Sequence, residues 1–349
     1  MGVTCKVLLN RPRVGFHTPG GPVIGVVRYT IDKPTKFTEI VLSVKGEGKC
    51  NWTTSVNNRT THYSGREKYV DMKKKLQLTN TSERELEVAT GEYEENFCFY
   101  LPNCIPSSYK DGVGSISYRV QIKFVRPGVF QFNKKFYRDI MVREYRNAIL
   151  PQIPLQVNSK KTLFLMFSAK EEVIVTNCTI NKSVLLAGFP AELNIFVSNN
   201  STVKIKKMNA ELVSHNAYTS GNGCKKKISK THKSCSQSSG SIKKSDKAEM
   251  SLTLPTKPDM VTVRHSSVIT REYEVHITAV LPFPHRNQCL KIPVVIETPA
   301  LDMVDEATLE NTKISSHVDS YSAVNYLETP PPSYWEVMCE DKEINKNNG

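Results

Sequence analysis

Four residues near the C-terminal end have types and spacing that suit recognition of another protein. Pro331, Pro332, Ser333 and Tyr334 follow Pro330 and form one Pro-Pro-x-Tyr motif. Consecutive prolines favour the polyproline II helix before binding, so little conformational entropy is lost on docking. The proline rings fit an aromatic groove such as that of a WW domain, and the Tyr334 ring fills a neighbouring pocket. We therefore expect Pro331, Pro332 and Tyr334 to bind a WW domain, with Ser333 as a spacer that faces away.

The same region contains a second short pattern. Tyr321 is followed three residues later by Val324, which fits a tyrosine-based sorting signal read by strand addition to a sheet edge. Patterns this short are common, so a solvated tail is the alternative to a sorting signal. A chance proline-rich linker is likewise the alternative to the Pro-Pro-x-Tyr motif.

The densest positive charge lies between Ser220 and Lys247. This segment has one acidic residue, Asp246, and the eight lysines Lys225, Lys226, Lys227, Lys230, Lys233, Lys243, Lys244 and Lys247. Its serines and glycines leave little to bury, so we expect a mobile hairpin excursion, a Lys/Ser-rich loop at 220–247. The loop is either simply solvated, or contacts anionic lipid at about 1 kcal/mol per Lys, or serves nuclear targeting or nucleic-acid contact. No aromatic residues are interleaved with these lysines, so we expect no nucleic-acid partner.

Cysteine and histidine spacing predicts no metal site. Cys224 and Cys235 lie among the lysines, where positive charge favours the thiolate, and a redox role is one reading of this pair. His232 between them does not complete a zinc-ligand spacing, so we expect no metal and no other cofactor. The nine cysteines include no CxxC pair and are expected to be mostly small buried residues in a reducing compartment.

No residues form a recognisable catalytic set, so we expect a protein that is not an enzyme. The segment Gly46–Lys49 superficially resembles a phosphate-binding loop, but Ser43 and Cys50 stand where that motif needs Gly and then Ser or Thr. We interpret this segment as a hairpin turn. Adjacent carboxylates such as Glu94 and Glu95 would face opposite sides of a strand and so cannot share one site.

The elements that must position these residues are strands. Apolar and polar residues alternate with a period of two, and no long window has the period of a helix. The clearest runs place on one face Ile40, Leu42 and Val44; Tyr118, Val120, Ile122 and Phe124; Leu193, Ile195 and Val197; and Tyr273, Val275, Ile277 and Ala279. Such alternation, punctuated by Gly, Pro and Asn turns, predicts antiparallel β-sandwiches.

The chain of 349 residues is long enough for two such domains. Pro151 and Pro154 interrupt the alternation, which stops after Pro299. We therefore expect a sandwich at 1–147, a hinge at 148–158, a second sandwich at 159–300 with its loop at 220–247, and a tail at 301–349. The tail contains ten acidic and three basic residues, which predicts an acidic, disordered segment with little to bury.

The charge and hydropathy of the sequence indicate in which cellular compartment the protein is expected. The net charge is +13, and because the tail carries −7, the rest carries +20 and should be drawn to anionic surfaces. No run of apolar residues is long enough for a transmembrane helix. The apolar run Val7–Leu9 is too short for a secretory signal, so we expect a cytoplasmic protein. A secreted adhesion protein is the alternative that the seven Asn-x-Ser/Thr matches favour, although we interpret these as turn residues.

Several segments, taken in order, match a known family pattern. In the first half these are Leu8–Pro12, Pro19–Gly25, Lys33–Ile40, Lys45–Trp52, Leu101–Pro102, Pro106–Ser108, Gly114–Tyr118 and Arg126–Pro127. In the second half they are Leu252–Pro255 and Ile292–Thr298. With these segments the chain resembles the arrestin domain-containing proteins, or α-arrestins, over about residues 6–300. Gly128 departs from the family pattern, because relatives commonly carry Trp there.

The resemblance implies two arrestin-like, immunoglobulin-like sandwiches and an adaptor role. By this reading the protein links membrane-protein cargo, a receptor or a transporter, to a WW-domain ubiquitin ligase of the HECT class. It would promote ubiquitination, endocytosis and endosomal sorting, with recruitment from the cytoplasm to the plasma membrane and endosomes. The alternative is an arrestin-fold sorting scaffold, similar to a retromer subunit, that acts without recruiting a ligase.

Overall fold

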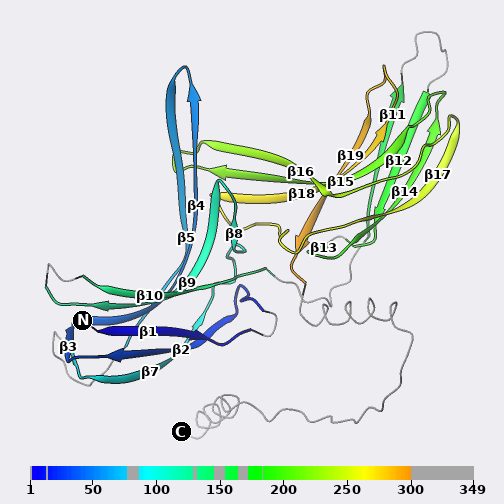
Figure 1. The fold of residues 1–349 in the computed structure, drawn as a ribbon. Helices are drawn as coiled ribbons and strands as arrows, with labels where there is room; N and C mark the ends of the chain where they lie inside the picture. The colour runs from blue at the N-terminus through cyan, green and yellow to red at the C-terminus, as the bar shows by residue number, and fades with distance from the viewer. Residues whose placement is uncertain are drawn as a thin grey trace, which may run out of the picture. The chain divides into compact units, whose positions relative to one another are not determined.

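The computed structural model describes residues 2–12, 15–76, 86–128, 132–144, 154–163, 172–182 and 184–299. These residues form strands throughout and contain no helix, so the expected all-β fold is confirmed. Figure 1 shows the strands arranged in packed sheets. In the described part of the chain, no helix is long and apolar enough to cross a membrane.

The N-terminal sandwich is built from two antiparallel sheets. The smaller sheet has the strand order β1-β2-β7, with β1 at Val3–Leu9, β2 at Pro22–Ile31 and β7 at Gly91–Tyr100. The larger sheet has the order β10-β9-β4-β5, and β8 pairs with β9. Its strands are β4 at Glu39–Val56, β5 at Arg59–Lys75, β8 at Tyr109–Lys110, β9 at Gly114–Val125 and β10 at Lys134–Ile140. A separate pair is formed by β3 at Thr35–Phe37 and β6 at Leu86–Val88.

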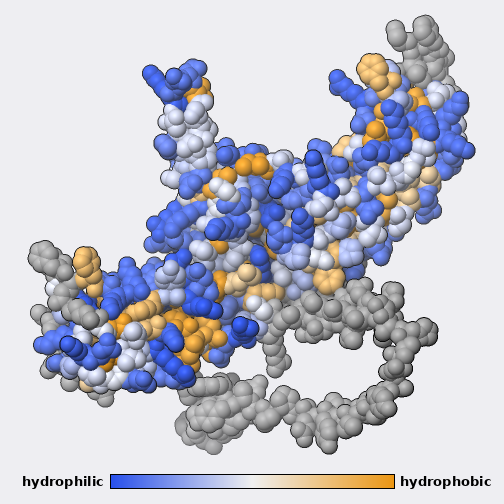
Figure 2. All heavy atoms as spheres, in the orientation of Figure 1, coloured by the Kyte–Doolittle hydropathy of each residue, from blue (hydrophilic) through white to orange (hydrophobic). Residues whose placement is uncertain are grey.

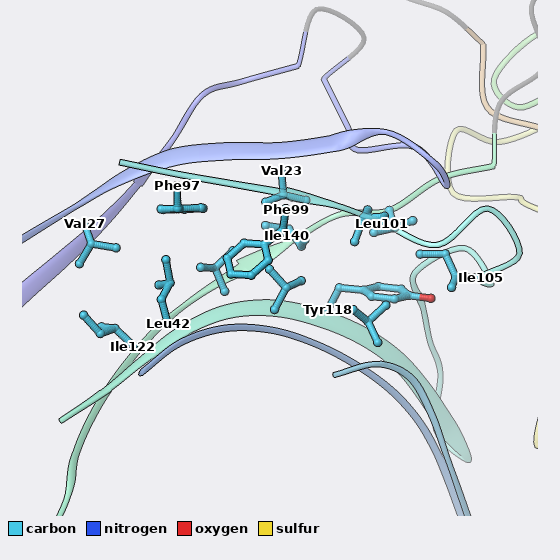
Figure 3. Close-up of a cluster of buried hydrophobic side chains, with 14 of the residues drawn as sticks. Val23, Val27, Leu42, Phe97, Phe99, Leu101, Ile105, Tyr118, Ile122 and Ile140 are labelled. Carbon is cyan, nitrogen blue, oxygen red and sulfur yellow. The ribbon is translucent and has the colours of Figure 1, made fainter. Parts of the chain in front are cut away.

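The core of this sandwich follows the predicted alternation. On β9 the four apolar residues from Tyr118 to Phe124 are fully buried, while the residues between them are partly exposed. Figure 3 shows Phe97 and Phe99 of β7 opposite Leu42 of β4. Because each buried side chain of this size contributes about 1.5–3 kcal/mol, the alternation decides which face of each sheet turns inward.

The C-terminal sandwich has the same two-layer construction. One sheet has the order β11-β12-β14-β17, with β11 at Leu155–Leu163, β12 at Glu172–Ile180, β14 at Ala191–Asn200 and β17 at Asp246–Leu254. The other has the order β13-β19-β18-β15-β16, with β13 at Val184–Leu186, β15 at Lys207–Thr219, β16 at Lys225–Ser238, β18 at Ile269–Val280 and β19 at Gln288–Glu297. The pairing of β13 with β19 is parallel, and the other pairings in these two sheets are antiparallel.

The core of the C-terminal sandwich also has the predicted residues inside. Leu193, Ile195 and Val197 of β14 are fully buried, as are Tyr273 and the alternate residues that follow it on β18. Strand β11 begins at Leu155, so the end of the predicted hinge at 148–158 belongs to a sheet. The expected domain boundaries themselves stay predictions.

The Lys/Ser-rich segment is not a loop, and this expectation was wrong. Residues Lys225–Ser238 form strand β16, which pairs with β15 at the edge of the larger C-terminal sheet and is interrupted by a bulge at Lys233–Cys235. Cys235 and, beyond the strand, Ile242 are buried and fix this segment to the core. An edge strand needs to bury only one face, and lysines on it discourage pairing with other chains, so a Lys-rich composition is compatible with a strand.

The segment Gly46–Lys49 lies inside β4, so its interpretation as a hairpin turn was also wrong. The register between β4 and β5 shifts between Gly46 and Glu47, which marks a β-bulge. A Cβ atom on Gly46 would lie 2.4 Å from the Tyr118 ring, so a glycine is required for close packing there. The hairpin that joins β4 to β5 instead turns at Asn57–Asn58, and Figure 2 shows that its surface is mainly hydrophilic.

Candidate functional site

The two tail motifs lie outside the described residues. Pro331, Pro332 and Tyr334, predicted to bind a WW domain, and Tyr321 and Val324, predicted as a sorting signal, therefore stay predictions. The structure does describe all eight lysines of the predicted lipid contact.

Strand geometry divides these lysines into separate groups. On β16, Lys225 and Lys227 lie opposite Thr219 and Ala217 of β15 and share their face, whereas Lys226 lies opposite the buried Tyr218 and points to the other face. The paired length of β16 covers ten steps of β15, or about 33 Å at the usual rise per residue. Lysines at the two ends of the strand are therefore too far apart to act as one cluster.

Lys230 of β16 lies opposite Ser214 of β15, and Lys233 lies at the bulge of the same strand. The other three lysines lie beyond β16. Lys243 and Lys244 are exposed in the connection to β17, and Lys247 pairs with Ser198 of β14. Asn199 holds this connection in place, because its side-chain amide donates a 2.8 Å hydrogen bond to the Lys243 carbonyl. These three lysines form a basic group on the opposite sandwich layer from Lys225. Contact with anionic lipid stays a prediction for each group.

The predicted redox pair is separated by the same strand. Cys224 is exposed just before β16, whereas Cys235 is buried near its far end. The register from Thr219–Lys225 to Leu212–His232 spans seven steps of β15, or about 23 Å. A disulfide needs Cα atoms within about 7 Å, so these two cysteines cannot form one in this structure.

The N- and C-terminal sandwiches meet at a junction that joins β15 and β18 to the β8–β9 region. Tyr218, Val268 and Ile269 are buried in the hydrophobic core of the N-terminal sandwich. A Cβ atom on Gly114 would lie 2.7 Å from Cδ1 of Ile269, so the two sandwiches pack without space for a further methyl group. We call this contact the junction.

Asp111 is the polar centre of the junction. It accepts hydrogen bonds from the Tyr109 hydroxyl at 2.7 Å, from the Tyr218 hydroxyl, and from the backbone amides of Val113 and Gly114 at 2.9 and 2.8 Å. Burial raises the pKa of the Asp111 carboxyl, but the hydrogen bonds outweigh burial and hold this pKa below its ordinary value. The carboxylate therefore ties a turn of one sandwich to a strand of the other.

A second polar contact joins β5 to the loop before β18. The Tyr69 hydroxyl lies 2.7 Å from Oγ of Ser266, which donates a 3.2 Å hydrogen bond to Glu67. The Ser267 amide donates to the same Glu67 oxygen at 2.8 Å. Burial raises the pKa of the Tyr69 hydroxyl, so this group stays protonated and available as a donor.

Arg143 and His232 each feel the charge of Arg271, and His232 also feels those of Lys230 and Lys257. We refer to Arg143, Lys230, His232, Lys257 and Arg271 as the junction cations. Burial and the charge of Arg271 lower the pKa of Arg143. Burial and the charges of Arg271, Lys230 and Lys257 likewise lower the pKa of His232. The carboxylate of Asp259 opposes both shifts. The cluster therefore carries more positive than negative charge.

Arg271 has the environment of an anion-binding residue. Its guanidinium carbon lies 5.4 Å from the centroid of the Tyr109 ring and 5.0 Å from that of Tyr273. Its buried Nε atom has no hydrogen-bond partner among the described residues, and no described carboxylate forms an ion pair with it. An acidic group that entered the junction would supply a hydrogen-bond acceptor for Nε and an ion-pair partner for the guanidinium.

The sequence contains no local signal for the junction as a whole. Asp111 lies in a Lys-Asp-Gly turn, and Arg143 and Arg271 are separated by more than a hundred residues. The polar network depends on which strands of the two sandwiches meet, and no local pattern encodes that arrangement. The signal that was present is the buried side of β18, where Arg271 interrupts an otherwise apolar face.

Comparisons with known proteins agree with this architecture. The family model described as "Arrestin (or S-antigen), N-terminal domain" matches residues 5–146, and the corresponding C-terminal domain model matches residues 170–301. Together these matches cover well over half of the chain. The chain therefore belongs to the arrestin family, as an arrestin domain-containing protein. Proteins of this family are generally adaptors without enzymatic activity.

One curated relative is "Arrestin domain-containing protein 17" of Caenorhabditis elegans, which is 26% identical over 132 residues. The aligned part is 36% of this chain and 31% of the relative. The chain thus spans about a third of the length of the curated relative that it matches.

Proposed function

We propose that this protein is a trafficking adaptor that links membrane-protein cargo to a WW-domain ubiquitin ligase of the HECT class. The observation that carries the proposal is the combination of two arrestin domains with a Pro-Pro-x-Tyr motif in the acidic segment that follows them. The ligase performs the chemistry, and this chain brings ligase and cargo together. Ubiquitination of the cargo would then lead to endocytosis and endosomal sorting.

The tail motif supplies the ligase-binding half of this proposal. One motif binds one WW domain with a dissociation constant of order 1 µM, which corresponds to about −8 kcal/mol. Since the sequence has a single copy, it lacks the avidity that a second motif would add. A cargo that holds the adaptor at a membrane compensates by raising the local concentration of the bound ligase.

The junction cations support the cargo-binding half. Arg271 is partly buried, is flanked by two aromatic rings and has an unused donor, so it suits a carboxylate or a phosphate group. An acidic or phosphorylated cytoplasmic segment of a receptor or transporter is the cargo that this chemistry fits. Such a segment would contact both sandwiches at once.

Proximity labelling in cells tests the adaptor role. The full chain fused to a labelling enzyme is compared with its Tyr334→Ala variant, and Ser333→Ala serves as the matched control because that side chain faces away from the groove. We expect ligases with WW domains to be labelled by the wild type and by Ser333→Ala, and to be lost from Tyr334→Ala. Cargo labelling should persist in all three chains. Equal ligase labelling by Tyr334→Ala would favour a sorting scaffold that acts without a ligase.

A further inference from the structure

Two histidines and a glutamate form a compact cluster on the outer face of the larger C-terminal sheet. His215 lies on β15, and Glu274 and His276 lie on the neighbouring strand β18. Glu274 and His276 are two residues apart and therefore share a face of β18. That face is opposite to the one that packs Tyr273 and Val275 into the core. This cluster is separate from the junction cations, because Arg271 lies on the same face of β18 as Tyr273 and Val275.

The three side chains direct their ligand atoms toward one another. Nε2 of His276 lies 2.7 Å from Oε2 of Glu274, and Nε2 of His215 lies 3.1 Å from the same oxygen. One ligand atom from each residue lies within 4.8 Å of the other two. In a tetrahedral zinc site with bonds of about 2.0–2.1 Å, ligand atoms stand about 3.4 Å apart. Small side-chain rotations would convert the observed spacing into that geometry.

The orientation of His215 is fixed from its other side. Its Nδ1 atom lies 2.8 Å from Oγ of Ser229 on the edge strand β16. When Nδ1 donates to Ser229, the lone pair of Nε2 faces Glu274, as metal-binding histidines require. Nε2 is buried and has no well-aligned hydrogen-bond partner among the described residues, although it is close to the carboxylate. A lone pair that faces a carboxylate is unfavourable unless a cation lies between them.

The surrounding charges favour a dication. Glu272 lies directly opposite His215, and Glu211 lies directly opposite His276, so both carboxylates share the face of the cluster. Lys291 of β19 also lies opposite His276. Lys227 of β16 shares this face, two residues from Ser229. With neutral imidazoles, the three carboxylates and these two lysines still sum to −1.

We propose that His215, Glu274 and His276 bind one divalent transition-metal ion of the zinc class, with Ser229 as the residue that orients His215. Two imidazole nitrogens and one carboxylate oxygen form a donor set that suits Zn²⁺ and Co²⁺ better than Mg²⁺ or Ca²⁺, which prefer oxygen ligands. The three residues leave a fourth position to water, because the side chains of His215 and Glu274 are about one-third exposed. The bound ion would link β15 to β18 close to the edge strand.

The test is a titration of the full chain with Zn²⁺ in competition with a chromophoric chelator, and with Co²⁺ by visible absorption. We expect one ion per chain on nitrogen and oxygen ligands. Glu274→Gln and His276→Gln should each weaken binding by at least about tenfold, and Ser229→Ala by about tenfold. His62→Gln, which changes an exposed histidine on β5, is the matched control and should bind as the wild type does.

Two results would overturn the proposal. One is equal affinity for the wild type and His276→Gln. The other is a Co²⁺ spectrum dominated by a thiolate charge-transfer band, which would place the ion on exposed cysteines such as Cys98 or Cys289. Thermal unfolding shows whether each variant is folded, since a folded chain has a cooperative transition. Zn²⁺ should raise the Tm of the wild type and of His62→Gln but not that of Glu274→Gln.

Discussion

The carboxylate of Asp111, in the turn before β9, accepts a hydrogen bond from the hydroxyl of Tyr218 at the end of β15. Asp111 belongs to the N-terminal sandwich and Tyr218 to the C-terminal one. The same carboxylate accepts hydrogen bonds from two backbone amides of its own turn. This single side chain therefore couples the local shape of a turn to the contact between two domains.

Replacing this carboxylate should loosen the junction. In Asp111→Asn, hydrogen bonds to a charged acceptor are lost, and we expect the free energy of unfolding to fall by about 1.5–3 kcal/mol. Urea unfolding measures this change. The matched control is Asp139→Asn, which removes an exposed carboxylate 3.4 Å from Arg119 and should cost less than about 1 kcal/mol. Equal losses in the two variants would show that Asp111 has no special role.

The same carboxylate predicts a pH dependence. The pKa of Asp111 in the folded chain lies below its ordinary value of 3.8, so the ionised form stabilises the folded state. This contribution is complete above about pH 5 and is lost as the pH falls through the folded-state pKa. The difference in unfolding free energy between the wild type and Asp111→Asn should therefore be constant from neutral pH down to about pH 5 and shrink below that. A difference that grows on acidification would contradict the assignment.

The strands that build each sandwich were predictable because their apolar and polar residues alternate, which shows which face of each strand is buried. The runs Tyr118 to Phe124 and Tyr273 to Ala279 each predict one buried face and one solvent-exposed face. Strand β16 was not predicted, because the Lys- and Ser-rich composition of this segment is typical of a loop and does not reveal its pairing with β15. Its lysines and serines bury little, yet β15 pairs with the strand on both sides of a bulge at Lys233–Cys235.

Close packing at the junction gives an independent prediction. In Gly114→Ala the new methyl group would meet Cδ1 of Ile269 at 2.7 Å and the Lys49 carbonyl oxygen at 3.0 Å. We expect a loss of about 1–3 kcal/mol, measured by thermal or urea unfolding. Gly112→Ala is the neighbouring control, because nothing lies within 4 Å of its Cβ position, and it should change stability by less than about 0.5 kcal/mol. Matching losses would argue against tight packing at Gly114.

The charge of the junction predicts binding of anionic peptides. Arg271→Gln should weaken the affinity of the full chain for an acidic phosphoserine peptide by about tenfold or more, since a charge-assisted hydrogen bond is worth about 1.5–3 kcal/mol. Fluorescence anisotropy at two salt concentrations measures this change, and added salt should weaken binding in the wild type. Lys243→Gln removes an equal charge outside the junction and should have little effect. If both variants bind equally well, the junction is not the peptide site.

The candidate sites were harder to predict than the fold because they depend on register. Glu274 and His276 were visible as the polar face of one alternating run, but nothing in the sequence placed His215 beside them. Arg143 and Arg271 meet only because two sandwiches pack together. In contrast, the Pro-Pro-x-Tyr motif is local, so the sequence alone carries the whole prediction for Tyr334.

The most direct measurement is calorimetric titration of the purified full chain with a recombinant WW domain, for the wild type, Tyr334→Ala and Ser333→Ala. We expect a dissociation constant of order 1 µM for the wild type and for Ser333→Ala, and no measurable heat of binding for Tyr334→Ala. Equal dissociation constants for the wild type and Tyr334→Ala, or no binding by the wild type, would contradict the proposal that this protein recruits a ligase through its tail.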